Sequence, residues 1–215
     1  MNIGARAPVG ILGGTFDPVH YGHLRAAVEV REKLGLGDVH MLPSANPPHR
    51  PAPATSARHR LAMLQAAISC QEYLVADDCE MRRSGPSYMV DTLAEFREQS
   101  PNGSLVLIIG QDAANGLDRW HRWKHLFELA HIAVMCRPGA TSTYRGDLEA
   151  EMHKRRVNDP AALSRSPAGC AIAVEITRLE ISSTAIREKA AAGLSLLYLA
   201  PPAVIEYIRE HGLYA

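Results

Sequence analysis

The segment that most constrains the fold is a glycine turn between an apolar run and a helical pattern near the start of the chain. Residues 9–12 form a short apolar run of the kind found in buried strands, and residues 24–30 have the apolar spacing of a helix. The order of the residues between them is Gly13-Gly14-Thr15-Phe16-Asp17-Pro18-Val19-His20-Tyr21-Gly22-His23. Strand, turn and helix in this order predict the first βα unit of an α/β fold.

The same turn has the properties of an anion site. Glycine lets the backbone approach an anion closely, and the N–H groups at a helix start attract it. His20 and His23 are three residues apart, so if both are helical their imidazoles project from one face and would donate to one phosphate. A metal site is the alternative, although H-x-x-H needs further ligands at short spacing and none follows nearby.

A second segment near the end of the chain points to the same chemistry. Residues 171–176 are expected to form a strand, and a helix is expected to open within the sequence Ile181-Ser182-Ser183-Thr184-Ala185-Ile186-Arg187. The hydroxyls of Ser183 and Thr184 would cap the helix or face an anion, and the guanidinium of Arg187 matches phosphate oxygens. Taken alone, the segment favours a simple cap with a surface arginine. Paired with the first segment, it favours a phosphate contact.

Together the two segments resemble the signatures of the nucleotidylyltransferase superfamily, whose H-x-G-H element is shared with class I aminoacyl-tRNA synthetases. Within this superfamily the chain is most similar to the bacterial nicotinate-nucleotide adenylyltransferases. Supporting matches lie between the signatures, at Asn46-Pro47-Pro48-His49-Arg50, Pro86-Ser87-Tyr88, Ile108-Ile109-Gly110-Gln111-Asp112, Trp120 and Cys136-Arg137. The resemblance covers nearly the whole chain.

The rest of the pattern predicts a doubly wound parallel sheet of the Rossmann-like nucleotidylyltransferase type, because strands and helices alternate. Further strands are expected at 39–43, 73–75, 105–109 and 131–135, helices at 56–69 and 89–99, and an irregular loop at 44–55. In such sheets the ligand binds beyond the carboxyl ends of the strands. Gly13-Gly14, Asn46 and Gly110-Gln111-Asp112 each follow a predicted strand, so three segments point to one crevice.

The resemblance implies transfer of AMP from ATP to nicotinate mononucleotide, with Mg²⁺ accompanying ATP and no metal site of the protein's own. The catalytic residues implied are His20, His23 and Arg187. The ATP-binding residues implied are Gly13, Gly14, Thr15, Phe16, Gly110, Asp112, Ser183 and Thr184. The mononucleotide-binding residues implied are Asn46, His49, Arg50, Tyr88, Met89, Trp120 and Arg137. The attacking phosphate is already anionic, so the reaction needs alignment and charge stabilisation and no general base.

Several of these residues have a structural alternative. Asp112 is expected to hold the ribose hydroxyls of ATP, but the cap of a helix would look the same. Trp120 is expected to stack on the pyridine ring, and Trp123 is the indole that would suit core packing. Three basic residues are expected to contact phosphate, but each taken alone would be interpreted as a surface cation: His49, Arg50 and Arg137.

Substrate preference is less firmly implied than adenylyl transfer. Many relatives carry threonine after the tyrosine at which this chain has Tyr88, and this chain carries Met89. Methionine has no hydroxyl for the nicotinate carboxylate, so recognition would use the backbone N–H groups of Tyr88 and Met89. An amide-preferring enzyme stays open, as does a catalytically silent nucleotide-binding regulator, although both histidines and Arg187 are present. Pantetheine-phosphate adenylyltransferases, the third alternative, are shorter.

Composition agrees with one nucleotidylyltransferase domain over residues 1–215. The chain is 47% hydrophobic and 21% charged, and its 23 Lys and Arg balance its 23 Asp and Glu. Zero net charge gives no general attraction for nucleic acid. The chain has no signal-peptide pattern, no membrane-length apolar run and no C-x-x-C among its four cysteines, so we expect a cytoplasmic protein without a membrane partner. A homo-oligomer stays open, and residues 141–169 are expected to be a polar excursion with a short helix near 148–152.

Overall fold

The computed structural model describes residues 7–46, 53–136, 142–177 and 179–215. In these residues six parallel strands form one sheet in the order β3-β2-β1-β4-β5-β6. The strands are β1 Val9–Gly14, β2 Val39–Pro43, β3 Leu74–Ala76, β4 Leu105–Gly110, β5 His131–Cys136 and β6 Ala171–Glu175. The doubly wound parallel sheet expected from the sequence is confirmed.

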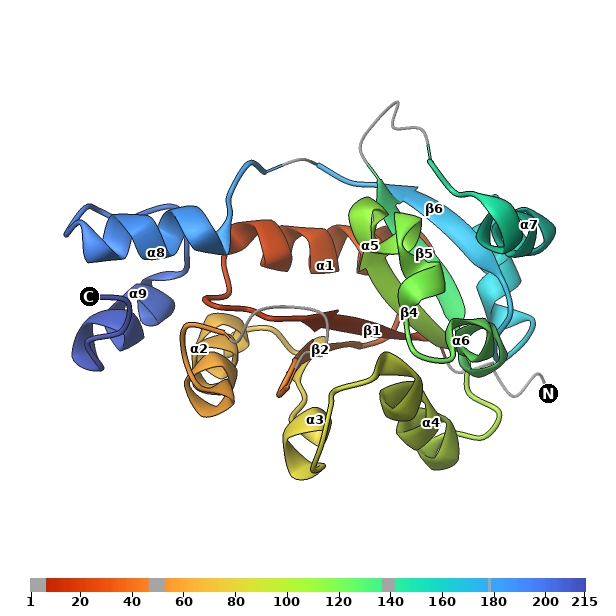
Figure 1. Cartoon of the computed structure of the whole chain (residues 1–215), viewed down its shortest axis with the longest axis horizontal. Coiled ribbons are helices and arrows are strands. Elements are labelled where there is room, and N and C mark those ends of the chain that lie inside the picture. Colours follow the sequence, from red (N-terminus) through yellow and green to blue (C-terminus); the bar gives the residue numbers. More distant parts are fainter. Residues whose placement is uncertain (1–6, 47–52, 137–141, 178) are drawn as a thin grey trace.

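Helices cover both faces of the sheet, with α1 on one side and α4 on the other (Figure 1). The α-helices are α1 Tyr21–Leu34, α2 Ala57–Ile68, α3 Cys79–Arg82, α4 Met89–Gln99, α5 Gln111–Asn115, α6 Trp123–Leu129, α7 Gly146–Arg155, α8 Ser183–Ala191 and α9 Pro202–Glu210. Two short 3₁₀ helices are η1 Leu117–Arg119 and η2 Pro160–Ser164. Within the described ranges, no helix combines the length and apolarity of a membrane span.

The central strands are buried on both faces, so their side chains feed two separate cores. Leu12 and Ile108 pair across β1 and β4 and belong to the core under α1, α8 and α9. Their neighbours Ile11 and Leu107 also pair, and they belong to the core under α4, α6 and α7. Alternation of side chains along each strand produces this division. It explains why these strands are continuous apolar runs in the sequence.

The structure differs from the predicted elements mainly in the short helices. The predicted strands and long helices are present with boundaries shifted by a few residues, and the strand predicted at 9–12 continues through Gly14. Helices α3, α5 and α6 were not predicted, because four to seven residues carry too little periodicity. Helix α9 was also missed, although Pro202 at its first turn is a recognised start signal.

The order of the strands reverses between β1 and β4, which are neighbours in the sheet. Chain connections leave β1 toward β2 on one side and β4 toward β5 on the other, so the loops at their carboxyl ends diverge and leave room for a ligand. Helix α1 follows β1, and α5 directly follows β4. Gly14 and Gly110, which end β1 and β4, therefore lie at this switch point, where the sequence analysis expects the ligand.

A buried arginine ties together the loops at this edge of the sheet. Arg60 of α2 is 1% exposed, and its guanidinium donates to the backbone oxygens of Thr15 (2.7 Å), Ser44 (2.7 Å) and Thr55 (3.3 Å). These carbonyls lie after β1, after β2 and before α2. Burial lowers the pKa of Arg60, and the nearby Asp17 carboxylate opposes that shift. One side chain thus fixes three loops and faces a buried opposite charge.

We predict that Arg60→Leu destabilises the fold by about 3–5 kcal/mol, because Asp17 would remain buried without its counter-charge and three carbonyls would lose a donor. The measurement is urea unfolding of the variant and the wild type. Arg58→Leu is the matched control, since Arg58 lies exposed on the same helix, and it should change stability by less than about 0.5 kcal/mol. Equal losses of stability in the two variants would contradict the role of Arg60 in fixing the three loops.

Candidate active site

The two histidines of the first motif lie against each other at the start of α1. Their rings are stacked, with centroids 3.7 Å apart and planes 26° apart. His20 is the N-cap residue with an extended backbone, and His23 is inside the first turn, so the condition that both are helical is not met by His20. The common face is nevertheless formed. Gly22 is needed between them, because a Cβ there would come within 3.0 Å of the His20 ring.

The pair is desolvated and neutral at pH 7. Burial lowers the pKa of His20 to about 4. The pKa of His23 is lowered to about 3, first by burial and then by repulsion from His20. His23 is partly exposed as a whole residue, but the Nδ1 atoms of both rings are buried and find no hydrogen-bond partner among the described residues. Such unsatisfied imidazoles are suited to an anionic ligand.

Phe16 packs against this pair of histidines. Its ring packs edge-on against His23 with centroids 5.0 Å apart, and it is 2% exposed. The side chain assigned to ATP binding therefore belongs to the core, and only the backbone of Phe16 remains for a nucleotide. Its φ of 49° turns the chain at this point, which is unusual for an aromatic residue and marks a functional loop.

The second motif lies directly beside the first. Helix α8 starts next to the start of α1 (Figure 1). The Ser183 hydroxyl donates to the Pro18 carbonyl (3.0 Å), and Arg187 donates to the Asp17 carbonyl (2.7 Å) and to the Thr184 hydroxyl (3.3 Å). The predicted proximity of Thr184 and Arg187 is thus observed, and the two motifs are joined by hydrogen bonds. Two helix N-termini converge on one region, which concentrates positive potential there.

The glycines and Asp112 lie on the other side of the same edge. Gly110 ends β4, and a Cβ placed there would meet nothing within 4 Å, so the space beyond it is open. Asp112 is exposed and is the second residue of α5, whose N-cap is Gly110. The alternative that Asp112 is a helix cap is therefore wrong. A Cβ at Gly13 would lie 2.7 Å from the Met89 methyl, at the far end of a flexible side chain, so Gly13 and Met89 lie close together at this edge.

A third group of predicted residues surrounds the start of α4. Asn46 and Ser87 form reciprocal bonds, from the Asn46 N–H to the Ser87 hydroxyl (3.0 Å) and from the Ser87 N–H to the Asn46 carbonyl (2.9 Å). Tyr88 is the N-cap residue of α4 without a side-chain cap. The Tyr88 N–H, which was expected to bind the carboxylate, already donates to the Pro86 carbonyl (3.1 Å), and the Asp91 N–H donates to the Tyr88 carbonyl (3.1 Å). The N–H groups left for a ligand are those of Met89 and Val90. The ring of Tyr88 stacks on the ring of His121, with centroids 4.4 Å apart. His121 was missed by the sequence analysis.

The two tryptophans have different surroundings. Trp120 is the C-cap residue of η1 and packs at the margin of the second core, as do Tyr88 and Met89. Trp123 packs edge-on against Phe127 with centroids 6.3 Å apart, and Lys124 lies over its ring. Trp123 therefore has the packing role considered for it. The predicted contacts His49, Arg50 and Arg137 lie outside the described residues.

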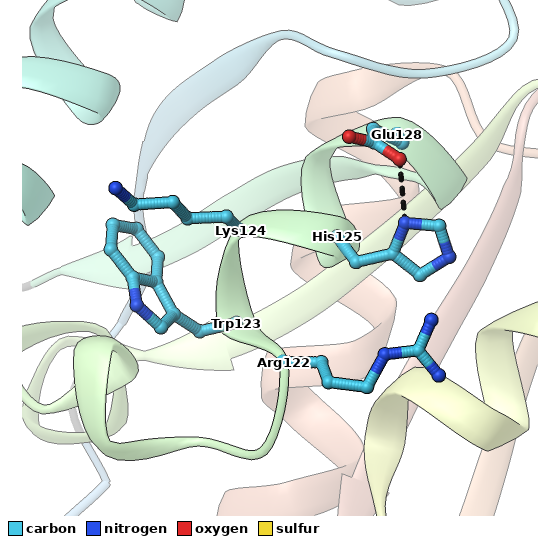
Figure 2. Close-up of a pocket in the computed structure, with 5 residues that line it drawn as sticks. All are labelled: Arg122, Trp123, Lys124, His125 and Glu128. Atoms are coloured by element: carbon cyan, nitrogen blue, oxygen red, sulfur yellow. Dashed lines mark hydrogen bonds and ion pairs between the residues drawn. The ribbon is translucent and has the colours of Figure 1, made fainter.

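A surface hollow beside Trp123 is separate from this arrangement. Figure 2 shows its lining, which comes from the start of α6 and consists of Arg122, Trp123, Lys124, His125 and Glu128. His125 is paired with Glu128, and Lys124 is paired with Asp147 of α7. Lys124 and His125 thus already have partners. None of the residues predicted to bind substrate lines the hollow, and we do not assign it to the site.

Two residues of the site were not assigned by the sequence analysis although they organise it. Asp17 lies within the first motif, and its carboxylate is buried among hydrogen-bond donors. Arg60 lies on the apolar side of its helix with Met63 and Leu64, and a cation in an apolar stripe is a signal that could have identified it. Tyr214, which donates to Asp17 at 2.6 Å, has no comparable signal in the sequence.

The low pKa values of the two histidines predict a pH dependence of stability. Because the unfolded chain binds protons below about pH 6.5 and the folded pair does not until about pH 4, stability should fall as pH decreases from 7 to 5, by up to about 2 kcal/mol for each histidine. The double variant His20→Asn/His23→Asn should lose less stability between pH 7 and pH 5. Tripolyphosphate at pH 5 should restore stability to the wild type only. Identical pH profiles would contradict the prediction. Urea unfolding provides the measurement.

Comparisons with known proteins agree with this geometry. A family model described as cytidylyltransferase-like matches residues 11–189. A probable nicotinate-nucleotide adenylyltransferase of Methylococcus capsulatus is 48% identical over 208 residues, which are 96% of this chain and 99% of that protein. A protein of the same description from Pseudomonas syringae pv. tomato is 46% identical over 96% of this chain and 93% of its own length.

A solved structure supports the fold. Plasmodium falciparum nicotinic acid mononucleotide adenylyltransferase, complexed with NaAD, is similar to this chain with a TM-score of 0.70 at 19% identity, and the similarity covers 97% of each chain. The sequence relatives extend over nearly the full length of the chain. The chain therefore belongs to the cytidylyltransferase-like family and, within it, to the nicotinate-nucleotide adenylyltransferases.

Proposed function

We propose that the protein transfers the AMP group of ATP to nicotinate mononucleotide, forming nicotinate adenine dinucleotide and pyrophosphate in NAD biosynthesis. The observation that carries the proposal is the stacked, desolvated pair of His20 and His23 where the N-termini of α1 and α8 meet. Membership of the adenylyltransferase family supports it. A phosphate oxygen of the mononucleotide forms a bond to the α-phosphorus of ATP, and the bond to pyrophosphate breaks.

The histidines would act as donors to the triphosphate. Each neutral imidazole has one N–H, and a nearby polyanion also favours uptake of a second proton because it raises the pKa that burial has lowered. Donors that are already in place cost little reorganisation as charge develops on the phosphates. No base is needed, since the attacking phosphate is an anion at neutral pH. His20 and His23 thus stabilise charge and align the reacting groups.

Helix α8 would bind the leaving pyrophosphate. The two hydrogen bonds of Arg187 use two of its five N–H groups, so the guanidinium can hold phosphate oxygens while it stays bound to Asp17. The Ser183 hydroxyl already donates to Pro18, and we assign phosphate binding to the backbone N–H of Ser183 and to the Thr184 side chain. These assignments adjust the sequence-based role of Ser183 from a hydroxyl contact to a backbone contact.

The adenosine and mononucleotide would lie on opposite sides of the phosphates. We place adenosine over Gly110, where the backbone is open, with the exposed Asp112 carboxylate on the ribose hydroxyls. Gly13, Gly14 and Thr15 would contact the nucleotide through their backbone. We place the pyridine ring near Trp120 and Tyr88, with its carboxylate at the first N–H groups of α4. Asn46 would contact the same substrate, and His49, Arg50 and Arg137 stay predictions.

The family uses ATP, and we propose that Mg²⁺ accompanies it. The side chains that we place at the phosphates are imidazoles, hydroxyls and a guanidinium, and the buried carboxylate of the same motif, Asp17, is already satisfied by three donors. This donor set fits a metal that is held mainly by phosphate oxygens and water, as is usual for Mg²⁺ with nucleotides. When bound, the metal would offset the charge of the triphosphate.

We further propose that residues 1–215 act as one domain located in the cytoplasm. Asp17 from the first βα unit and Tyr214 from the last residues contact each other at the site, so neither end of the chain is dispensable for it. All four cysteines are free thiols, which fits a reducing compartment.

We predict that His23→Ala lowers the rate of adenylyl transfer by about two orders of magnitude or more while the protein stays folded, because a preorganised donor is worth about 2.7–4 kcal/mol in the transition state. The measurement is pyrophosphate release from ATP and nicotinate mononucleotide. His125→Ala is the matched control, because its ring is paired with Glu128 away from the site, and it should retain wild-type activity. Near-normal turnover by folded His23→Ala would refute the assigned role.

We also predict that nicotinate mononucleotide exceeds the amide mononucleotide in kcat/KM by about tenfold or more. A carboxylate offers two charged acceptors to the N–H groups of α4, whereas the NH₂ of an amide leaves a donor unpaired, at about 1–3 kcal/mol. Competition of the two substrates in one assay measures the preference. Trp120→Ala should weaken binding of both mononucleotides. An amide preference, or unchanged kinetics in Trp120→Ala, would contradict this arrangement of the pocket.

A further inference from the structure

The Asp17 carboxylate is held by three donors from two other parts of the chain. It accepts from the Ala54 N–H (2.6 Å), the Thr55 hydroxyl (2.8 Å) and the Tyr214 hydroxyl (2.6 Å). Asp17 is 3% exposed, so these bonds replace water as the solvation of a buried charge. Bonds to a charged acceptor are the strong ones among protein hydrogen bonds. The position of Asp17 therefore depends on all three donors.

The backbone of the same residue holds the catalytic arginine. The Asp17 carbonyl accepts from Arg187 at 2.7 Å, and the next carbonyl, that of Pro18, accepts from Ser183 at 3.0 Å. The side chain of Asp17 thus faces Tyr214 while its peptide faces α8. Any rotation of the Asp17 residue moves the carbonyl that positions the guanidinium. Tyr214 and Arg187 are linked through a single residue.

Tyr214 is directed to Asp17 by the turn after α9. Gly212 and Tyr214 both have positive φ values, of 57° and 66°, and the Leu213 N–H donates to the Ile208 carbonyl at 2.9 Å. Helix α9 packs against α2, the helix that carries Arg60. Burial, and secondly the bond to Asp17, raises the pKa of Tyr214. The hydroxyl therefore remains a neutral donor at every physiological pH.

We propose that Tyr214 is a positioning residue for adenylyl transfer: its hydroxyl fixes the Asp17 carboxylate and, through the Asp17 peptide, the phosphate-binding geometry of Arg187. The proposal rests on the function proposed above. It concerns the triphosphate side of the site, because the Asp17 carbonyl accepts from Arg187, to which we assign the leaving pyrophosphate. Its effect should therefore appear with ATP and not with the mononucleotide.

The test is Tyr214→Phe, which removes the hydroxyl and keeps the ring. We expect kcat/KM for ATP to fall by about tenfold, the effect of losing roughly one hydrogen bond to a charged group, while KM for nicotinate mononucleotide stays within about twofold. Tyr207→Phe is the matched control, since the Tyr207 hydroxyl on α9 bonds to His59 (3.0 Å) and not to the site. The Tyr207→Phe variant should have unchanged kcat/KM for ATP and unchanged KM for nicotinate mononucleotide.

A double-mutant cycle with Arg187→Lys identifies the route of the effect. Because Tyr214 acts through Arg187, the two losses in kcat/KM should be strongly non-additive, with a coupling of at least about fivefold. Additive losses, or wild-type kinetics in Tyr214→Phe, would overturn the proposal. If Tyr214→Phe does not fold, Thr55→Val removes another hydroxyl from the same carboxylate oxygen, and its loss with ATP should couple to Arg187→Lys in the same way; additivity there would also overturn it.

A second readout separates this inference from the proposed function. Tripolyphosphate should raise the melting temperature of the wild type and raise that of Tyr214→Phe less, because a ligand stabilises in proportion to its affinity for the folded state. If the wild type forms no dinucleotide but shows this difference, the proposed function fails and the positioning role stands. If the wild type forms dinucleotide and the shifts are equal, the positioning role fails alone.

Discussion

The arrangement of the site depends on the buried pair of opposite charges, Asp17 and Arg60. Arg60 holds the backbone of three loops at the carboxyl edge of the sheet, and Asp17 accepts from the segment before α2 and from Tyr214. A buried charge is costly unless it is solvated by fixed dipoles. Each charge therefore favours the arrangement of the loops in which its hydrogen-bond partners face it, and this includes the loop between β1 and α1.

The protein has no net charge, so only the local charges and dipoles around Asp17 and the two histidines can attract a polyanion. The attraction is local: two helix N-termini, two desolvated imidazoles and one guanidinium converge at the switch point of the sheet. The imidazoles are uncharged while the site is empty, so His20 and His23 do not repel each other strongly before the nucleotide arrives.

Much of the fold followed from local pattern, and the site followed only in part. Continuous apolar runs indicated the strands of a parallel sheet, and the long periodic segment 89–99 matched α4 at both ends. The joining of the first motif to Arg187 was inferred from the motifs themselves, and its hydrogen bonds are present. The short helices α3 and α5 were missed because a single turn has no period. The common face of the two histidines was expected only if both are helical, and it forms although the chain is still extended at His20.

The sequence by itself determined the doubly wound class of the sheet, the βα unit that carries the histidines and the family to which the chain belongs, because apolar periodicity and motif residues can be read along the chain without knowledge of its packing. Only the tertiary structure decided which distant groups complete the site. Tyr214 reaches Asp17 from 197 positions away, and His121 stacks on Tyr88 from another loop. In a parallel sheet, crossover connections separate neighbours in space by long stretches of chain, so contacts of this kind leave no local signal.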